Sequence, residues 1–215
     1  MNSSVVKICA DTLKNHYREN YGVKLKSSHA HELVASFFGY KSKNAMLSDS
    51  NYPPELICGS EVVICKPVSL LEKRIEVLEN FPLSIKPSDV FELIFSQVAT
   101  KLSEENGHSV LFQDKISYVK HYLATSDRWK ETFTKFAKFD FEYLIESEES
   151  RDKLELTIKH GTRISDSELS GMGQTVLSFN RVSCTIGFNS PSEALEVWTG
   201  GFRQILKLKK GEQNG

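Results

Sequence analysis

The stretch FDFEYLIESEESRDKLELTI, residues 139–158, decides the fold class, because its apolar residues recur at every second position rather than at helical intervals. Such alternation is typical of a strand with one buried face. The polar run 147–152 separates two alternating segments, which therefore predict an antiparallel hairpin. The side chains expected to point into a core between sheet and helices are Phe139, Phe141, Tyr143, Leu154, Leu156 and Ile158.

Three further strand-like segments follow this hairpin, at 175–188, 195–198 and 204–209. Asn189, Ser190 and Pro191 separate the first two of them, as turn residues do. Together with the hairpin, these segments predict a C-terminal antiparallel sheet of about five strands over residues 139–210.

The residues before 139 follow helical spacing instead. In 88–106 the apolar residues recur every three or four positions, Ser88 can cap the helix, and Gly107 can end it. Similar patterns predict helices at 69–78, 113–124 and 127–138. The apolar segment 55–66 is too short for its periodicity to separate a strand from a buried helical turn.

The first 51 residues predict a small three-helix module. One helix occupies 4–20, a second is capped by Ser27 or Ser28 and ended by Gly39, and a short third spans 42–48. Pro53 and Pro54 cannot continue a helix and close the module. The expected fold is therefore α+β, with a separable head at 1–51 and a body at 52–215, helical to about 138 and then an antiparallel sheet.

Composition narrows the class of protein. Hydrophobic residues make up 40% and charged residues 26% of the 215 residues, which is ordinary for a globular domain. The sequence contains no apolar run of spanning length and does not begin as an export signal does, so a cytoplasmic protein without membrane contact is expected. The cysteines are expected to be reduced thiols in apolar surroundings: Cys9, Cys58, Cys65 and Cys184.

The head is mildly basic, with seven basic and four acidic side chains and a net charge of +3 in residues 1–50. Ala35, Gly39 and Ala45 have the spacing of a helix-turn-helix. Such a motif would bring cationic and polar side chains to nucleic acid, namely Lys24, Lys26, Lys41, Lys43 and Asn44. Any tight three-helix module has the same packing needs, so nucleic-acid binding is one alternative among several.

The head also carries YGVKL at 21–25, SHAHELVA at 28–35 and FGY at 38–40. Over residues 12–49 this pattern resembles a small helical module of uncharacterised bacterial proteins, some of them labelled glyoxalase-superfamily. The resemblance implies a bacterial origin and a discrete head. No glyoxalase chemistry carries over, because the body lacks paired metal-binding strand modules with His and Glu at recognisable spacing.

The body has one polar, glycine-rich segment, at 160–174, which is predicted to be a long loop between strands. Loops on a rigid sheet often carry function. Its only plausible polar cluster comprises His160, Arg163 and Asp166, which makes an enzyme of unrecognised type an alternative. No nucleophile–base pair, metal-ligand set or cofactor motif supports this alternative, so no cofactor and no metal are expected.

The aromatic face near Phe139 and Phe141 is not expected to stack nucleic-acid bases, because the alternate positions Asp140 and Glu142 would repel phosphate. The leading hypothesis is thus a non-enzymatic bacterial binding or regulatory protein, which acts through contacts with a protein partner or with itself.

Overall fold

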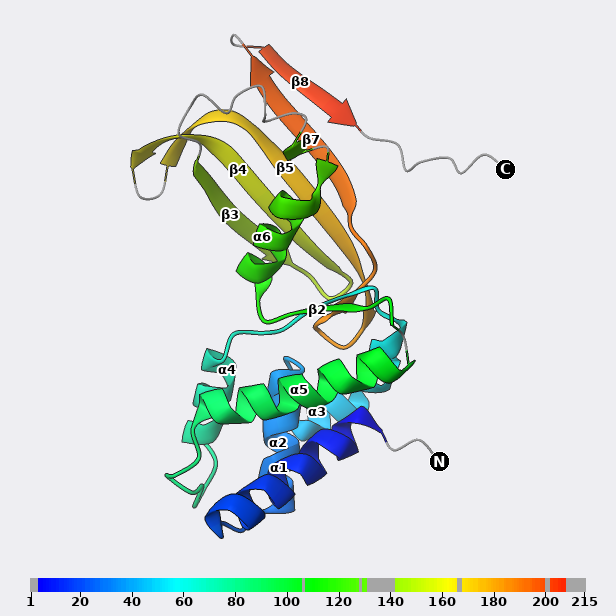
Figure 1. Ribbon diagram of the computed structural model, residues 1–215, viewed down its shortest axis with the longest axis vertical. Helices are drawn as coiled ribbons and strands as arrows, with labels where there is room; N and C mark the ends of the chain where they lie inside the picture. The colour runs from blue at the N-terminus through cyan, green and yellow to red at the C-terminus, as the bar shows by residue number, and fades with distance from the viewer. Residues whose placement is uncertain are drawn as a thin grey trace, which may run out of the picture. The chain divides into compact units, whose positions relative to one another are not determined.

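The computed structural model describes residues 4–105, 107–127, 129–130, 142–165, 168–199 and 202–207, drawn in Figure 1. The chain divides into two compact units: unit 1 is 1–115 with 181–189, and unit 2 is 116–180 with 190–215. Helices dominate unit 1 and an antiparallel sheet dominates unit 2. The predicted α+β class, with helices first and a sheet towards the C-terminus, is confirmed.

The head forms its three expected helices: α1 (Val5–Tyr21), α2 (Ser27–Phe37) and α3 (Lys43–Ser48). Gly22 ends α1 with φ 65°, a left-handed conformation that glycine adopts without strain. The Ser42 hydroxyl accepts a hydrogen bond from the Ala45 amide at the start of α3. The expected serine cap of α2 is wrong, because Ser27 is already helical and Lys26 holds the N-cap position without a side-chain cap.

Residues 54–64 contain both of the conformations left open by the sequence. A short 3-10 helix, η1 (Pro54–Gly59), precedes the strand β1 (Val62–Ile64). The helices α4 (Ser69–Glu76) and α5 (Pro87–Glu105) follow near their predicted positions. The strand β2 (Val110–Phe112), which pairs with β1 in parallel, was not predicted from the sequence.

Unit 1 takes in a segment from the C-terminal half of the chain. The predicted strand 175–188 is in fact two strands, β5 (Glu168–Ser183) and β6 (Gly187–Phe188), and β6 pairs with β1. Cys184 and Ile186 enter the same core cluster as α1, α2 and α5. The division between the two compact units therefore does not fall at the predicted boundary, residue 51. Residues 1–51 share their core with later segments of the chain.

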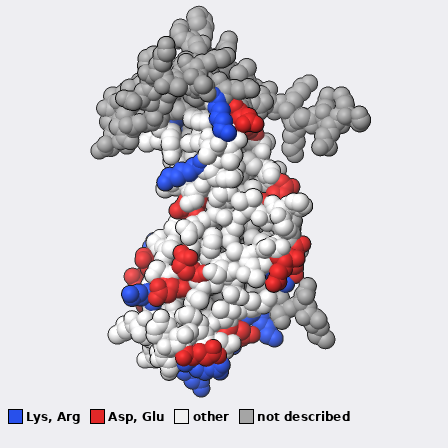
Figure 2. All heavy atoms as spheres, viewed as in Figure 1, with Lys and Arg blue, Asp and Glu red and all other residues white. Residues whose placement is uncertain are grey.

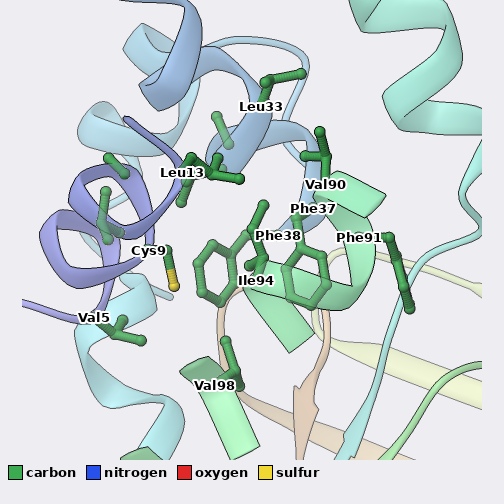
Figure 3. Close-up of a cluster of buried hydrophobic side chains, with 14 of the residues drawn as sticks. Val5, Cys9, Leu13, Leu33, Phe37, Phe38, Val90, Phe91, Ile94 and Val98 are labelled. Atoms are coloured by element: carbon green, nitrogen blue, oxygen red, sulfur yellow. The ribbon is translucent and has the colours of Figure 1, made fainter. Parts of the chain in front are cut away.

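The core of unit 1 lies between α1, α2 and α5. Figure 3 shows Phe37 and Phe38, at the end of α2, between side chains of α1 and α5. Gly39 follows with φ 81°, and a Cβ at this position would overlap the Thr185 hydroxyl. That hydroxyl donates a 2.8 Å hydrogen bond to the Phe38 carbonyl, so a residue without a side chain is needed where 181–189 meets α2.

Unit 2 contains a five-stranded sheet, all of whose strand pairs are antiparallel. In order, its strands are β3 (Glu142–Glu149), β4 (Lys153–Ser165), β5, β7 (Ser192–Thr199) and β8 (Phe202–Lys207). The helix α6 (Lys115–Thr125) packs on one face, with the rings of Tyr118 and Phe179 5.1 Å apart (Figure 1). The predicted antiparallel sheet of about five strands is confirmed.

The predicted inward face is largely confirmed where it is described. Leu154, Leu156 and Ile158 are buried. Tyr143 pairs with His160 on this face but is 36% exposed, so its predicted burial is wrong, because β3 is an edge strand of the sheet. Phe139, Phe141 and nearly all of the expected helix at 127–138 lie outside the described residues.

The predicted loop at 160–174 is also wrong. Residues up to 165 continue β4, and residues from 168 onwards belong to β5. The ladder shifts register between His160 and Gly161, and it pairs Gly161 with Gly171. Glycines accommodate such bulges without strain, and this explains a polar, glycine-rich segment within strands.

Candidate partner-binding surface

A hollow of about 320 Å³ lies between α4 and the corner that joins α2 to α3. The corner contributes Ser36, Gly39, Tyr40 and Lys41. From α4 and the residue after it come Leu70, Lys73, Arg74 and Val77. We call this site the basic hollow, because three of its lining side chains are cationic.

Hydrogen bonds to main-chain carbonyls hold the walls of the basic hollow in place. The Ser36 hydroxyl donates to the Leu70 carbonyl at 2.9 Å, which ties α2 to α4. The Tyr40 hydroxyl donates to the Tyr52 carbonyl at 2.7 Å. Burial raises the pKa of Tyr40 well above its ordinary value, so this phenol stays protonated and acts as a structural donor.

The cations of the basic hollow are only partly compensated. Arg74 Nη1 lies 3.8 Å from Glu32 Oε2, which also accepts a 3.2 Å hydrogen bond from the Lys43 amide. Lys41 and Lys73 are exposed, and neither forms an ion pair with any described residue. Two of the three cations of the hollow, Lys41 and Lys73, therefore form no ion pair with a described residue.

A second hollow, of about 400 Å³, lies at the C-terminal end of α4. Its lining is mainly apolar: Ile75, Leu78, Phe81, Pro82, Leu83 and Ile85, with Glu76 and Asn80. Leu83 is fully exposed, and Asn80 makes the turn with φ 55°, which asparagine tolerates. We call this site the apolar hollow.

Both hollows include residues from α4 and its C-terminal end. Val77 lines the basic hollow and is 65% exposed, whereas its neighbour Leu78 lines the apolar hollow. Exposed apolar side chains beside a cationic hollow are typical of a protein-binding surface. We call the two hollows together the α4 surface.

The structure separates the residues that were predicted to contact nucleic acid. Lys24 and Lys26 precede α2, whereas Lys41, Lys43 and Asn44 follow it. The 11 residues of α2 span about 16 Å at 1.5 Å per residue. Of the five residues, only Lys41 lines the basic hollow. The second helix of the expected helix-turn-helix, α3, has only six residues.

Charge on the α4 surface is mixed rather than uniformly basic. On the face seen in Figure 2, both basic and acidic side chains are scattered over the described residues, and neither kind forms a continuous patch. On α4 itself, Glu72 and Glu76 flank Lys73 and Arg74. These carboxylates would repel an extended polyanion, whereas a single anionic group can enter the basic hollow.

His160 lies inside unit 2, at 1% exposure. Its Nε2 is 3.4 Å from Thr175 Oγ1, and its ring is 5.0 Å from that of Trp129. Burial lowers the pKa of His160 to about 4, so the imidazole is neutral at pH 7. Asp166 and the side chain of Arg163 lie outside the described residues, so the predicted cluster stays a prediction.

The four cysteines are thiols, and three of them are buried. Burial raises the pKa of Cys9 to about 12, and burial together with a hydrogen bond to Glu105 raises that of Cys58 to about 11. Thiols of such high pKa are poor nucleophiles at neutral pH. Within the described ranges, no group of three His, Cys, Asp or Glu side chains is placed to hold a metal ion.

Comparison of the chain with protein-family models, curated proteins and solved structures finds no match. The resemblance of residues 12–49 to a bacterial helical module thus stays a prediction. None of the helices in the described segments is long and apolar enough to cross a membrane.

The sequence analysis missed Lys73 and Arg74, although their spacing contains a usable pattern. Leu70, Lys73, Arg74 and Val77 stand at positions i, i+3, i+4 and i+7, and therefore share one face of α4. The apolar stripe of this helix is the stronger pattern in the sequence. Two lysines or arginines on an exposed helix are too common to indicate a site without the corner that faces them.

Proposed function

We propose that the chain is a non-enzymatic cytoplasmic binding protein that contacts a protein partner through the α4 surface of unit 1. The observation that carries the proposal is the presence of two hollows on α4, one cationic and one apolar, with Val77 and Leu83 exposed. A complementary partner segment would place apolar side chains in one hollow and an acidic group in the other.

Two alternatives are less well supported. An enzyme that uses His160 as a general base would need a pKa near the working pH, and a pKa of about 4 makes this imidazole a weak base at pH 7. A nucleic-acid reader would need its cations on one face, and α2 separates Lys26 from Lys41. Binding to a partner protein explains the exposed apolar side chains as well as the cations.

Selection from a displayed peptide library on the immobilised full chain tests this function. We expect the enriched peptides to combine apolar residues with a nearby Asp or Glu. Lys73→Glu should lower the affinity for a selected peptide about fivefold or more. A partly exposed ion pair contributes up to roughly 1 kcal/mol, and the reversed charge would repel the acidic group of the peptide. Leu83→Ser should weaken it about tenfold if the leucine becomes buried on binding.

Lys7→Glu is the matched control, because Lys7 is exposed on α1 and lines neither hollow. This variant should bind the selected peptides as the unmodified chain does. Peptides that bind equally well to Lys73→Glu, or that consistently lack acidic residues, would contradict the proposal. Tighter, salt-dependent binding of a DNA or RNA duplex would favour the nucleic-acid alternative instead.

A further inference from the structure

We infer that the basic hollow binds a phosphate monoester. This inference rests on the proposed function in that it names the chemistry recognised at one part of the same surface. Free phosphate esters and phosphorylated side chains of a partner share this chemistry, and the experiment below separates them.

The charge of the basic hollow suits a phosphate monoester. Lys41, Lys73 and Arg74 line it, and of the three only Arg74 forms an ion pair with a described residue, Glu32. The remaining two positive charges match a phosphate monoester, which carries about −1.5 to −2 at pH 7. A carboxylate would neutralise only one of them.

The hydrogen-bond donors of Arg74 also suit a phosphate group. Arg74 meets Glu32 through Nη1 at 3.8 Å, a distance too long for a strong hydrogen bond, so the fork of its guanidinium retains donors. Guanidinium groups bind phosphate oxygens bidentately, and lysines add point charges around them. Lys41 and Lys73, on opposite walls of the hollow, can supply these charges.

The size of the hollow and its remaining lining fit an ester rather than a bare ion. A volume of about 320 Å³ is at the lower end of the range for small-molecule sites and leaves space for the group that carries the phosphate. Leu70 and Val77 give that group an apolar wall. Glu72 and Glu76 on α4 disfavour a continuous polyanion, so one phosphate per site is expected.

The test titrates the isotope-labelled full chain with phenyl phosphate and, separately, with benzoate and inorganic sulfate, while amide chemical shifts are followed by NMR. At pH 7.5 we expect phenyl phosphate to shift the amides of residues around Gly39, Lys41 and Lys73, and to bind more tightly than benzoate. Between pH 7.5 and 5.5 its affinity should fall about fourfold, because the second pKa of a phosphate monoester is about 6.

Benzoate and sulfate keep their charge over this interval and serve as controls, since the described lining of the hollow includes no histidine. Their affinities should therefore change little. Lys41→Gln and Lys73→Gln should each weaken phenyl phosphate about fivefold, Lys73→Arg should retain binding, and Lys7→Gln should have no effect. A phosphoserine peptide with apolar flanks that binds more tightly than phenyl phosphate would identify a partner side chain as the source, and equal affinities a free ester.

Three results would overturn the inference: no shifts localised at the hollow, an affinity unaffected by both Lys→Gln variants, or the same pH response for phosphate and sulfate. The proposed function fails separately. If phosphate binds, no peptide is selected and the phosphoserine peptide binds no more tightly than phenyl phosphate, the site recognises a free phosphate ester rather than a protein. If acidic peptides are selected but phosphate does not bind, the protein-binding function stands and the phosphate inference falls.

Discussion

Replacing Phe38 by Ala should lower the free energy of unfolding by about 3 to 5 kcal/mol, the range for a phenylalanine removed from a packed core. Phe38 is fully buried between α1 and α5 (Figure 3), and its ring meets that of Phe37 edge to face at 5.5 Å. Its carbonyl also accepts a hydrogen bond from the Thr185 hydroxyl. The truncation would therefore leave a cavity at the point where α2 meets 181–189.

Urea denaturation of the full chain, followed by circular dichroism, measures this effect. Leu47→Ala is the control, because Leu47 is 68% exposed on α3, and its truncation should change stability by no more than about 0.5 kcal/mol. A loss below about 1 kcal/mol for Phe38→Ala would mean that this side chain is not part of a close-packed core.

Acidification should destabilise the protein through His160, by about 3 kcal/mol between pH 7 and pH 4. Burial lowers the pKa of the folded imidazole to about 4, against about 6.5 in the unfolded chain. The unfolded chain therefore binds the proton first as the pH falls. The stability that the neutral imidazole contributes is complete above about pH 6.5, and it is lost progressively down to pH 4.

Urea unfolding at several pH values, compared between the unmodified chain and His160→Gln, isolates this contribution from that of other titrating groups. His29, whose pKa is also lowered by burial, is present in both proteins and cancels in the comparison. The variant should lose less stability on acidification, by about 2 kcal/mol at pH 5 and about 3 kcal/mol at pH 4. Parallel pH curves for the two proteins would show that His160 is not held neutral in the fold.

The elements that depend on local pattern could be predicted from the sequence. Helices α1 and α5 carry apolar stripes and end at glycines or short polar turns, and β3 and the first half of β4 show alternation along their own length. These features need only neighbouring residues to be recognised. The alternation of β3 also placed Tyr143 on the correct face, but it contains no information about which strand lies at the edge.

Long-range pairing could not be predicted in this way. Strands β1, β2 and β6 have two or three residues each, and they come together from three distant parts of the chain. Residues 181–189 belong to unit 1 through contacts with distant segments, so the division between the units also could not be predicted from local pattern. The basic hollow likewise joins Lys41 to Lys73 and Arg74 across two segments, so only the α4 half of it had a pattern in the sequence.

Site-specific photo-crosslinking in cells tests the α4 surface most directly. A photoreactive amino acid replaces Val77 or Leu83 on this surface, or Tyr21 or Ile116 as exposed apolar controls elsewhere, which are 59% and 53% exposed. We expect one discrete protein adduct from positions 77 and 83, none from the controls, and loss of the adduct when Lys73→Glu is added. Equal adducts from all four positions, or an adduct that persists with Lys73→Glu, would contradict the proposed binding surface.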